Sequence, residues 1–263
     1  MSLNLIAIDI GNTNITAALY LKGEQQSITS IQTTAKQELT DWLKQAWEQI
    51  PIVKISKEQK RNGVIVVSSV NPAVAEQFEQ MVNEMGEKIL LIGRDLPLPM
   101  TVAVEKADKV GTDRVIAAAA AYEVAGAAVV VADIGTAMTI DLVDDSGVFL
   151  GGVICPGFEI SAKALNENTA QLPKLPKVTR PELPYGRNTA EAINNGLYYS
   201  VIGTLEEVIR RYAEKIGTWP QTVITGSGAR IIKEDCEFID SFVTDLVVKG
   251  IALAYRKFIE EKT

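Results

Sequence analysis

Short apolar runs alternate with amphipathic segments along this chain. Apolar runs of about four to eight residues bounded by Gly, Asn or Asp predict strands, and apolar residues three or four positions apart predict helices. In the first half the pattern predicts strands at 5–9, 15–20, 27–33, 63–67 and 88–92, a helix containing Leu39, Trp42, Leu43 and Trp47, and a helix over 72–85. This order is a β-meander followed by alternating helices and strands.

The second half repeats the order of the first. It predicts strands at 128–133, 138–143, 148–155 and 222–225, a turn at 144–147, and helices at 159–166, at 189–216 and from Leu246. Because the same order occurs twice, the sequence predicts a duplicated α/β domain.

Two proline-rich segments interrupt the pattern. Residues 172–185 contain Pro173, Pro176, Pro181 and Pro184, too many for a helix or a central strand, so we expect an extended surface segment. The second, Leu96 to Pro99, precedes the predicted domain boundary. We therefore predict an N-terminal domain at 1–110 and a C-terminal domain at 111–263.

Two predicted strands end in Asp-Ile-Gly followed by a small polar residue: Asp9-Ile10-Gly11-Asn12-Thr13-Asn14 and Asp133-Ile134-Gly135-Thr136-Ala137. Such a turn offers backbone N–H groups and one carboxylate to a phosphate or a hydrated cation. A single copy fits an ordinary Asn/Gly hairpin turn better. The second copy favours a duplicated phosphate-binding site.

Two other motifs are ambiguous when each is taken alone. Thr225-Gly226-Ser227-Gly228 is an ordinary strand-to-helix loop or a third glycine turn near a nucleotide. Gly111-Thr112-Asp113-Arg114 opens an Ala-rich helix, where Arg114 can bind a carboxylate and Asp113 can accept a proton from a hydroxyl. An acid at a helix start with a surface ion pair explains the second motif equally well.

Composition narrows the chemistry. The chain has 263 residues, a net charge of −7 and no histidine. The absence of histidine excludes a Ser-His-Asp triad and histidine-ligated zinc. The acidic balance argues against nucleic acid or an anionic membrane as the main partner, so a small ligand is expected.

The sequence also predicts a cytoplasmic protein. Only two cysteines occur, Cys155 and Cys236, and the N-terminus lacks the pattern of a signal peptide. The longest apolar zone, Val115 to Ala132, is interrupted by Glu123 and Gly126 and fits a helix plus a strand better than a membrane span.

Together, the motifs resemble those of the type III pantothenate kinases, members of the acetate kinase, sugar kinase, Hsp70 and actin superfamily. The resemblance covers nearly the whole chain. Its motifs are 9–14, 111–114, 133–137, Gly151 to Gly157, Thr169 to Pro173, Gly186 to Thr189 with Ala192-Ile193, Thr225-Gly226 and Asp245 to Gly250. The ordered series is far more specific than any one member.

The resemblance implies two ribonuclease H-like (actin-like ATPase) domains with an interdomain nucleotide cleft. It implies ATP-dependent phosphorylation of pantothenate, the first step of coenzyme A biosynthesis, by a homodimer that uses Mg²⁺ and a monovalent cation, K⁺ or NH₄⁺. The long apolar helix from Ala192 through Ile209 is either a dimer surface or intramolecular core.

The resemblance also assigns residues. Asp113 would be the catalytic base, and pantothenate would be bound by Gly111, Thr112, Asp113, Arg114 and Thr189. Asp133 would hold the monovalent cation, and Asp9 is a candidate for Mg²⁺ through water. ATP would be bound by Asp9, Ile10, Gly11, Asn12, Thr13, Asn14, Ile15, Thr16 and Thr136.

One departure keeps two alternatives open. Family members commonly carry a Tyr shortly before the Gly-x-Asp-Arg motif that contacts pantothenate, whereas Met100 to Val110 contains none. The chain could instead be a kinase of the same superfamily that acts on another small alcohol or acid. A non-catalytic regulatory homologue is the third hypothesis, although Asp113 and both Asp-Ile-Gly turns are intact.

Overall fold

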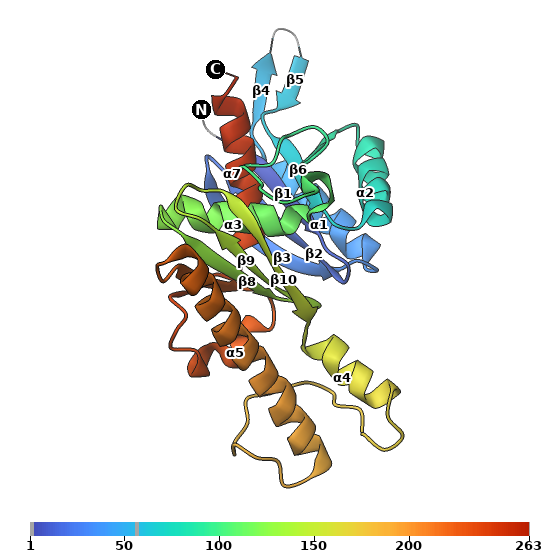
Figure 1. The fold of residues 1–263 in the computed structure, drawn as a ribbon. Helices are drawn as coiled ribbons and strands as arrows, with labels where there is room; N and C mark the ends of the chain where they lie inside the picture. The colour runs from blue at the N-terminus through green and yellow to red at the C-terminus, as the bar shows by residue number, and fades with distance from the viewer. Residues whose placement is uncertain (1–2, 56–57, 263) are drawn as a thin grey trace. The chain divides into compact units, whose positions relative to one another are not determined.

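The computed structural model describes residues 3–55 and 58–262, which form two compact units (Figure 1). Unit 1 consists of residues 1–100, 106–120 and 247–263 within that description, and unit 2 of 101–105 and 121–246. This grouping differs from a division at residues 110 and 111, because residues 111–120 and 247–263 belong to unit 1 and residues 101–105 to unit 2.

Unit 1 contains a five-stranded sheet in the order β3-β2-β1-β6-β7. The first three strands pair antiparallel, and β6 and β7 add to β1 in parallel. The strands are β1 (Leu5–Ile10), β2 (Asn14–Leu21), β3 (Glu24–Gln32), β6 (Val64–Ser69) and β7 (Ile89–Leu91). All five predicted strands of the first half are therefore confirmed.

Alternating residues of β1 face two different hydrophobic cores. Ile6 and Ile8 pack with α1 (Lys36–Gln49) and α2 (Pro72–Glu84), both of which the sequence predicted. Leu5 and Ala7 pack with residues of α3 (Thr112–Ala125) and α7 (Leu246–Glu260). The β1 strand therefore lies in the middle layer of unit 1, with helices on both faces.

Unit 2 repeats the topology of unit 1, with strand order β10-β9-β8-β11-β12. Its strands are β8 (Val129–Ile134), β9 (Ala137–Val143), β10 (Phe149–Pro156), β11 (Gln221–Thr225) and β12 (Ser241–Phe242), and its helices are α4 (Phe158–Glu167), α5 (Thr189–Ile216) and α6 (Ala229–Ile232). Short 3₁₀ helices lie at Ala107–Lys109 in unit 1 and at Lys233–Asp235 in unit 2. The equivalent strand orders confirm the predicted duplication.

Helix α5 has the predicted bounds and packs against its own unit. Asn188 caps its start by accepting a hydrogen bond from the Glu191 N–H at 2.9 Å, and Gly217 ends it with φ 79°. The buried residues Leu197, Val201, Leu205 and Ile209 join the core of unit 2, so these apolar side chains are intramolecular core.

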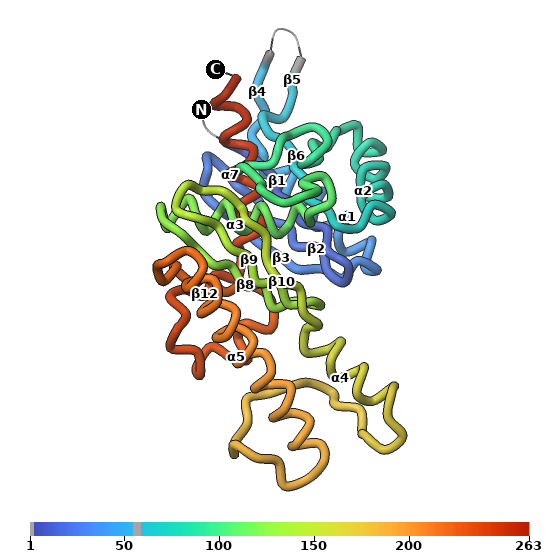
Figure 2. Tube along the Cα trace, in the orientation of Figure 1, coloured from blue at the N-terminus to red at the C-terminus, as the bar shows by residue number. Residues whose placement is uncertain are grey.

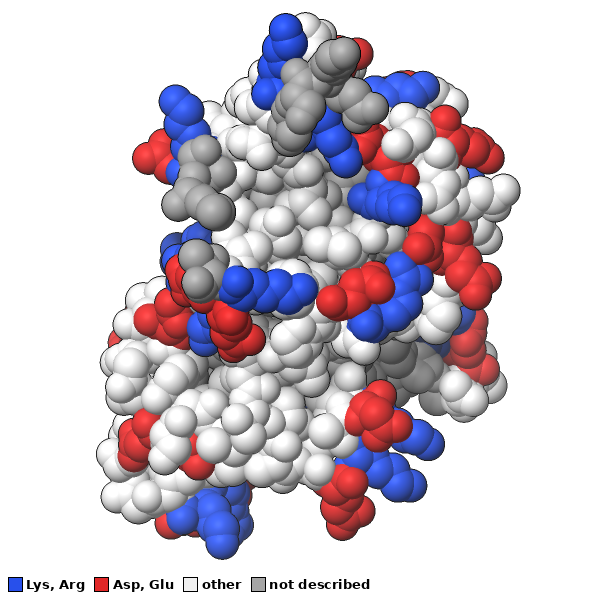
Figure 3. All heavy atoms as spheres, turned by 90° about the horizontal axis from the view of Figure 1, so that it is seen from above, with Lys and Arg blue, Asp and Glu red and all other residues white. Residues whose placement is uncertain are grey.

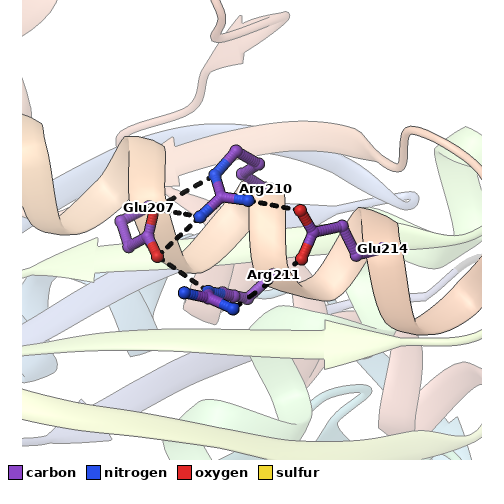
Figure 4. Close-up of polar contacts among 4 residues, drawn as sticks. All are labelled: Glu207, Arg210, Arg211 and Glu214. Carbon is purple, nitrogen blue, oxygen red and sulfur yellow. Dashed lines mark hydrogen bonds and ion pairs between the residues drawn. The ribbon is translucent and has the colours of Figure 1, made fainter.

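The exposed side of α5 carries a charged network (Figure 4). Glu207 accepts hydrogen bonds from the Nε atoms of Arg210 at 3.0 Å and Arg211 at 2.7 Å, and Arg210 also pairs with Glu214. Because these side chains are solvent-exposed, the network adds little to the stability of the folded state.

The sequence analysis missed two features. A separate antiparallel pair consists of β4 (Ile52–Ile55), a short and mostly apolar strand, and β5 (Glu58–Arg61), which contains only charged and polar residues. The β12 strand has only two residues and forms by pairing with β11. In both, pairing with a neighbouring strand rather than a local hydrophobic pattern creates the strand.

The proline-rich connection has no helix or strand, as predicted, but it is not a surface segment throughout, because Val178 is buried in the core of unit 2. Residues 168–188, all of them described, form no helix or strand and run as an extended trace between α4 and α5 (Figure 2).

Among the described residues, no helix combines the length and apolar character needed to cross a membrane. On the face drawn in Figure 3, basic and acidic side chains are interspersed.

Candidate active site

The first Asp-Ile-Gly turn connects β1 to β2 in unit 1. Ile10 pairs with Ile15, and the Gly11 N–H donates to the Asn14 carbonyl at 3.0 Å. Asn12, Thr13 and Asn14 are exposed, so their side chains lie at the surface of the turn. Ile10 and Ile15 are buried core residues, which leaves only their backbone for the ATP contact that the sequence predicts.

The neighbouring strand β3 supports this turn. Thr33, which follows β3, donates to the Thr13 carbonyl from its backbone N–H at 3.0 Å and from its hydroxyl at 3.2 Å. Thr16 pairs with Asp9 across the β1–β2 ladder. The predicted ATP segment 9–16 is thus a single strand-turn-strand structure.

The second Asp-Ile-Gly turn connects β8 to β9 in unit 2 and is shorter. Ile134 pairs with Met138, and the Gly135 N–H donates to the Ala137 carbonyl at 3.0 Å. Thr136 is exposed at the tip. Its side chain is therefore accessible for the phosphate contact that the sequence predicts.

Glycines pack closely around the second turn. A Cβ atom at Gly157 would lie 2.2 Å from the Gly135 carbonyl oxygen, and one at Gly226 would lie 2.3 Å from Asp133 Oδ1. The Gly228 N–H donates to the Ile134 carbonyl at 2.8 Å. These positions need glycine because any side chain would enter space that the turn occupies.

The acceptor motif, Gly111 to Arg114, lies at the start of α3 in unit 1. Asp113 Oδ1 accepts a hydrogen bond from the Arg114 N–H at 2.8 Å, and a Cβ at Gly111 would approach the same oxygen to 2.5 Å. The Thr112 hydroxyl lies 3.1 Å from that of Ser68 on β6. Asp113 is partly buried, not on an open surface.

Burial changes the proton affinity of Asp113. Desolvation raises the pKa of its carboxyl above the ordinary value, although the Arg114 N–H and the Arg114 charge act in the opposite direction. The ionised carboxylate is therefore a stronger base than an exposed aspartate. A perturbed carboxyl in this motif favours a role in proton transfer over a surface ion pair.

The sheet of unit 1 brings the ATP segment and the acceptor motif together. In the parallel pairing of β1 with β6, Asp9 lies opposite Ser68, whose hydroxyl contacts Thr112. The predicted phosphate turn and the motif with the predicted base therefore lie at the same edge of one sheet. Phosphoryl transfer requires such an arrangement, because the hydroxyl acceptor must lie near the phosphate donor.

Thr189 is the exposed first residue of α5 in unit 2. The turn before it is fixed by Glu191, which accepts from the Arg187 N–H at 2.7 Å and from the Asn188 side chain at 2.8 Å. A Cβ at Gly186 would lie 2.2 Å from the Ala192 nitrogen. Thr189 is thus held on a rigid turn, and its contact with pantothenate stays a prediction.

The described residues contain no group of three or more Cys, Asp or Glu side chains that could hold a metal ion. Asp9 and Asp133 instead each provide carboxylate oxygens beside a turn, the ligand type that Mg²⁺ and K⁺ accept. This donor set fits cations that take most of their remaining ligands from ATP, water or backbone carbonyls.

Sequence reasoning missed two parts of the site. Gly157 lay in a family motif but was given no role, and Ser68 was not considered. The cluster of glycines at Gly151, Gly152 and Gly157 was a local sequence signal for close backbone packing at Gly157. No local signal pointed to Ser68, because the residue that it contacts, Thr112, lies 44 positions away in the sequence.

Comparison with known proteins identifies related sequences. The type III pantothenate kinase family model matches residues 5–211. A type III pantothenate kinase of Agathobacter rectalis is 32% identical over 260 residues, covering 96% of this chain and 97% of that protein. One from Brevibacillus brevis is 33% identical over 254 residues, covering 96% and 98%.

Comparison with solved structures supports the fold. A Campylobacter jejuni protein described as a Baf-family transcriptional activator matches with a TM-score of 0.61 at 18% identity, over 98% of both chains. MreB 5 of Spiroplasma citri, bound to AMPPNP, matches with a TM-score of 0.51 at 12% identity, over 100% of both chains. The fold is therefore of the actin-like ATPase class.

Proposed function

The chain belongs to the type III pantothenate kinase family, and we propose how its residues divide the work of the family's reaction. That reaction, ATP-dependent phosphorylation of pantothenate, is the first step of coenzyme A biosynthesis. The observation that carries the proposal is the shared sheet edge in unit 1, where Asp9 lies opposite Ser68 and Ser68 contacts Thr112 beside Asp113.

Asp113 acts as the base toward the primary hydroxyl of pantothenate. The transition state of phosphoryl transfer is loose and the hydroxyl proton leaves late, so a carboxylate is sufficient and no histidine is needed. The raised pKa of Asp113 strengthens the base and also defines a pH below which it is protonated.

The other residues of the acceptor motif bind and orient the substrate. Arg114 pairs with the pantothenate carboxylate, Gly111 and Thr112 contact the body of the molecule, and Thr189 is a further pantothenate-binding residue. The turn at 9–16 and Thr136 bind the phosphates of ATP through backbone N–H and hydroxyl groups.

Two cations complete the proposal. Asp9 holds Mg²⁺ through water, and Asp133 holds K⁺ or NH₄⁺ beside the second turn. When bound, these ions neutralise negative charge on the phosphates. The close packing of Gly226 on Asp133 Oδ1 supports this role for Asp133, because it fixes the carboxylate against the turn.

An ATP-dependent assay with pantothenate, run with and without K⁺, tests the function. Turnover with pantothenate that K⁺ stimulates is the expected result. Turnover only with another small alcohol or acid would support the first alternative, and no turnover with any acceptor would support a regulatory homologue.

The variant Asp113→Asn tests the base. We expect kcat to fall by about a hundredfold or more, because the amide cannot accept the proton. In the unchanged protein, kcat/KM should fall at acidic pH with an apparent pKa above the ordinary aspartate value of 3.8. Asp113→Asn with unchanged kcat would remove Asp113 from the mechanism.

Stability provides an independent measurement of the same carboxyl. A carboxyl pKa raised by folding adds stability at low pH that is lost as pH rises through the folded-state pKa. Asp113→Asn should therefore unfold at a higher temperature than the unchanged protein at pH 8, and this difference should shrink toward pH 4. A lower Tm at pH 8 would contradict the burial argument.

We also propose that the enzyme is a cytoplasmic homodimer. Light scattering should give twice the mass of the 28.5 kDa chain, and cell fractionation should place the protein with cytoplasmic markers. A monomeric mass would contradict the first proposal and a membrane fraction the second.

A further inference from the structure

Ser68 is a fully buried polar residue to which the proposed mechanism gives no role. It lies on β6 with a relative exposure of 0%, and its hydroxyl is 3.1 Å from that of Thr112. A buried hydroxyl without a partner carries the cost of its desolvation, so this contact is favoured over leaving either group unbonded.

The Thr112 side chain has a defined orientation. Its Cγ2 methyl lies 3.7 Å from the position that a Cβ would occupy at Gly93, and its hydroxyl lies toward Ser68 and Ser69 on β6. The methyl and the hydroxyl thus lie toward two different segments of unit 1. Rotation of the side chain would move the hydroxyl away from Ser68 and Ser69.

One assignment of the hydroxyl protons satisfies both contacts. The Thr112 hydroxyl lies 3.4 Å from the Ser69 carbonyl, which can only accept, so Thr112 is the donor there. A hydroxyl has one proton, so with this assignment Ser68 is the donor in the 3.1 Å bond between the two hydroxyls. Thr112 Oγ1 then has a lone pair and no further proton to offer.

We propose that Ser68 is a positioning residue that presents Thr112 Oγ1 as a hydrogen-bond acceptor to the phosphate-accepting substrate. The complementary group on the substrate is a donor, a hydroxyl or an amide N–H. Ser68 thereby favours acceptors with such a donor near the hydroxyl that reacts beside Asp113. This inference rests on the proposed function, since Thr112 belongs to the acceptor motif.

Steady-state kinetics of Ser68→Ala test the inference. Without the donor, Thr112 is no longer held in one hydrogen-bonded state, so KM for pantothenate should rise about threefold to tenfold. The kcat value and KM for ATP should change less than about twofold, because Ser68 contacts neither the base nor the first turn's exposed residues.

Two further variants separate positioning from packing. Thr112→Val keeps the side-chain volume and removes the hydroxyl, so it should raise KM for pantothenate. Combining Ser68→Ala with Thr112→Val should raise KM no further than Thr112→Val alone, because both remove the same interaction.

Thr222→Val is the matched control. Thr222 is also a buried hydroxyl on a central strand, and it donates to the Phe238 carbonyl at 2.8 Å in unit 2, outside the acceptor motif. Loss of the Thr222 hydroxyl should lower Tm and leave KM for pantothenate unchanged. Ser68→Cys provides a second replacement of nearly equal volume with a weaker donor, and should give an intermediate KM.

The possible outcomes are distinct. A Ser68→Ala enzyme that has a lower Tm but an unchanged KM for pantothenate, or a double variant with additive effects, overturns the positioning role while leaving the kinase function intact. An unchanged protein that does not phosphorylate pantothenate overturns the proposed function, and the Ser68 inference fails with it.

Discussion

The first Asp-Ile-Gly turn is held by hydrogen bonds from Thr33 and exposes three polar side chains, whereas the second is enclosed by glycine backbone. Both begin at the same point of equivalent sheets, since Asp9 pairs with Ser68 and Asp133 pairs with Thr225 in the parallel ladders. The local motif is therefore the same and its surroundings differ.

The difference arises just after those paired residues. Ser69 follows Ser68 in unit 1. The hydroxyl oxygen of Ser69 accepts a hydrogen bond from the Asn71 N–H at 3.0 Å. Gly226 follows Thr225 in unit 2 and has φ +88° with its backbone against Asp133. One copy can thus accommodate a polar ligand around an open turn, while the other holds its carboxylate in a fixed position.

The largest expected effect concerns Gly226, which packs closely against the second Asp-Ile-Gly turn. Gly226→Ala should destabilise the protein by about 2 to 5 kcal/mol, because the new Cβ would lie 2.3 Å from Asp133 Oδ1 in a backbone conformation that favours glycine. Urea unfolding measures this change.

Two alanine variants act as controls for that measurement. Gly11→Ala places a Cβ 3.0 Å from the Asn14 carbonyl at the open turn and should cost about 1 kcal/mol. Gly203 is an exposed residue of α5, and a Cβ at this position would have no atom within 4 Å. Gly203→Ala should therefore stabilise the folded protein by about 0.5 to 1 kcal/mol. Equal losses at Gly226 and Gly11 would show that the two turns are not supported differently.

Substitution of Asp133 and of Asp9 should change the dependence of activity on two different cations. Asp133→Asn should raise the K⁺ concentration for half-maximal activity about tenfold or more, and Asp9→Asn should lower kcat/KM for MgATP by about tenfold to a hundredfold. Both substitutions preserve size, so titrating each variant with K⁺ and with Mg²⁺ isolates the charge. If both variants shift the dependence on the same cation, the division of roles is wrong.

The smallest expected effect concerns the support of the open turn. Thr33→Val removes the hydroxyl bond to the Thr13 carbonyl and should raise KM for ATP about twofold to fivefold, with a stability change within about 1 kcal/mol. The dependence on K⁺ should not change, because the second turn is untouched. Thr29→Val, on β3 and away from the turn, is the control. An unchanged KM for ATP in Thr33→Val would show that the backbone bond from Thr33 is sufficient.

Much of the fold followed from local patterns. The strands and helices that carry the site were predicted within a few residues, since the spacing of apolar residues is a local signal. The β4–β5 pair was missed because β5 has no apolar residue and the short β4 forms a strand by pairing with it. The sequence left open whether the apolar side chains of α5 form a dimer surface or intramolecular core. Their packing in the core of unit 2 decides for the second alternative.

The sequence by itself determined the duplicated order of elements, both Asp-Ile-Gly turns and the motif that contains Asp113, because periodicity and turn chemistry are written in neighbouring residues. Only the tertiary structure decided that Ser68 contacts Thr112, that Gly157 packs against Gly135 and that burial raises the pKa of Asp113. These properties depend on strand register and desolvation, which arise when residues far apart in the chain are brought together.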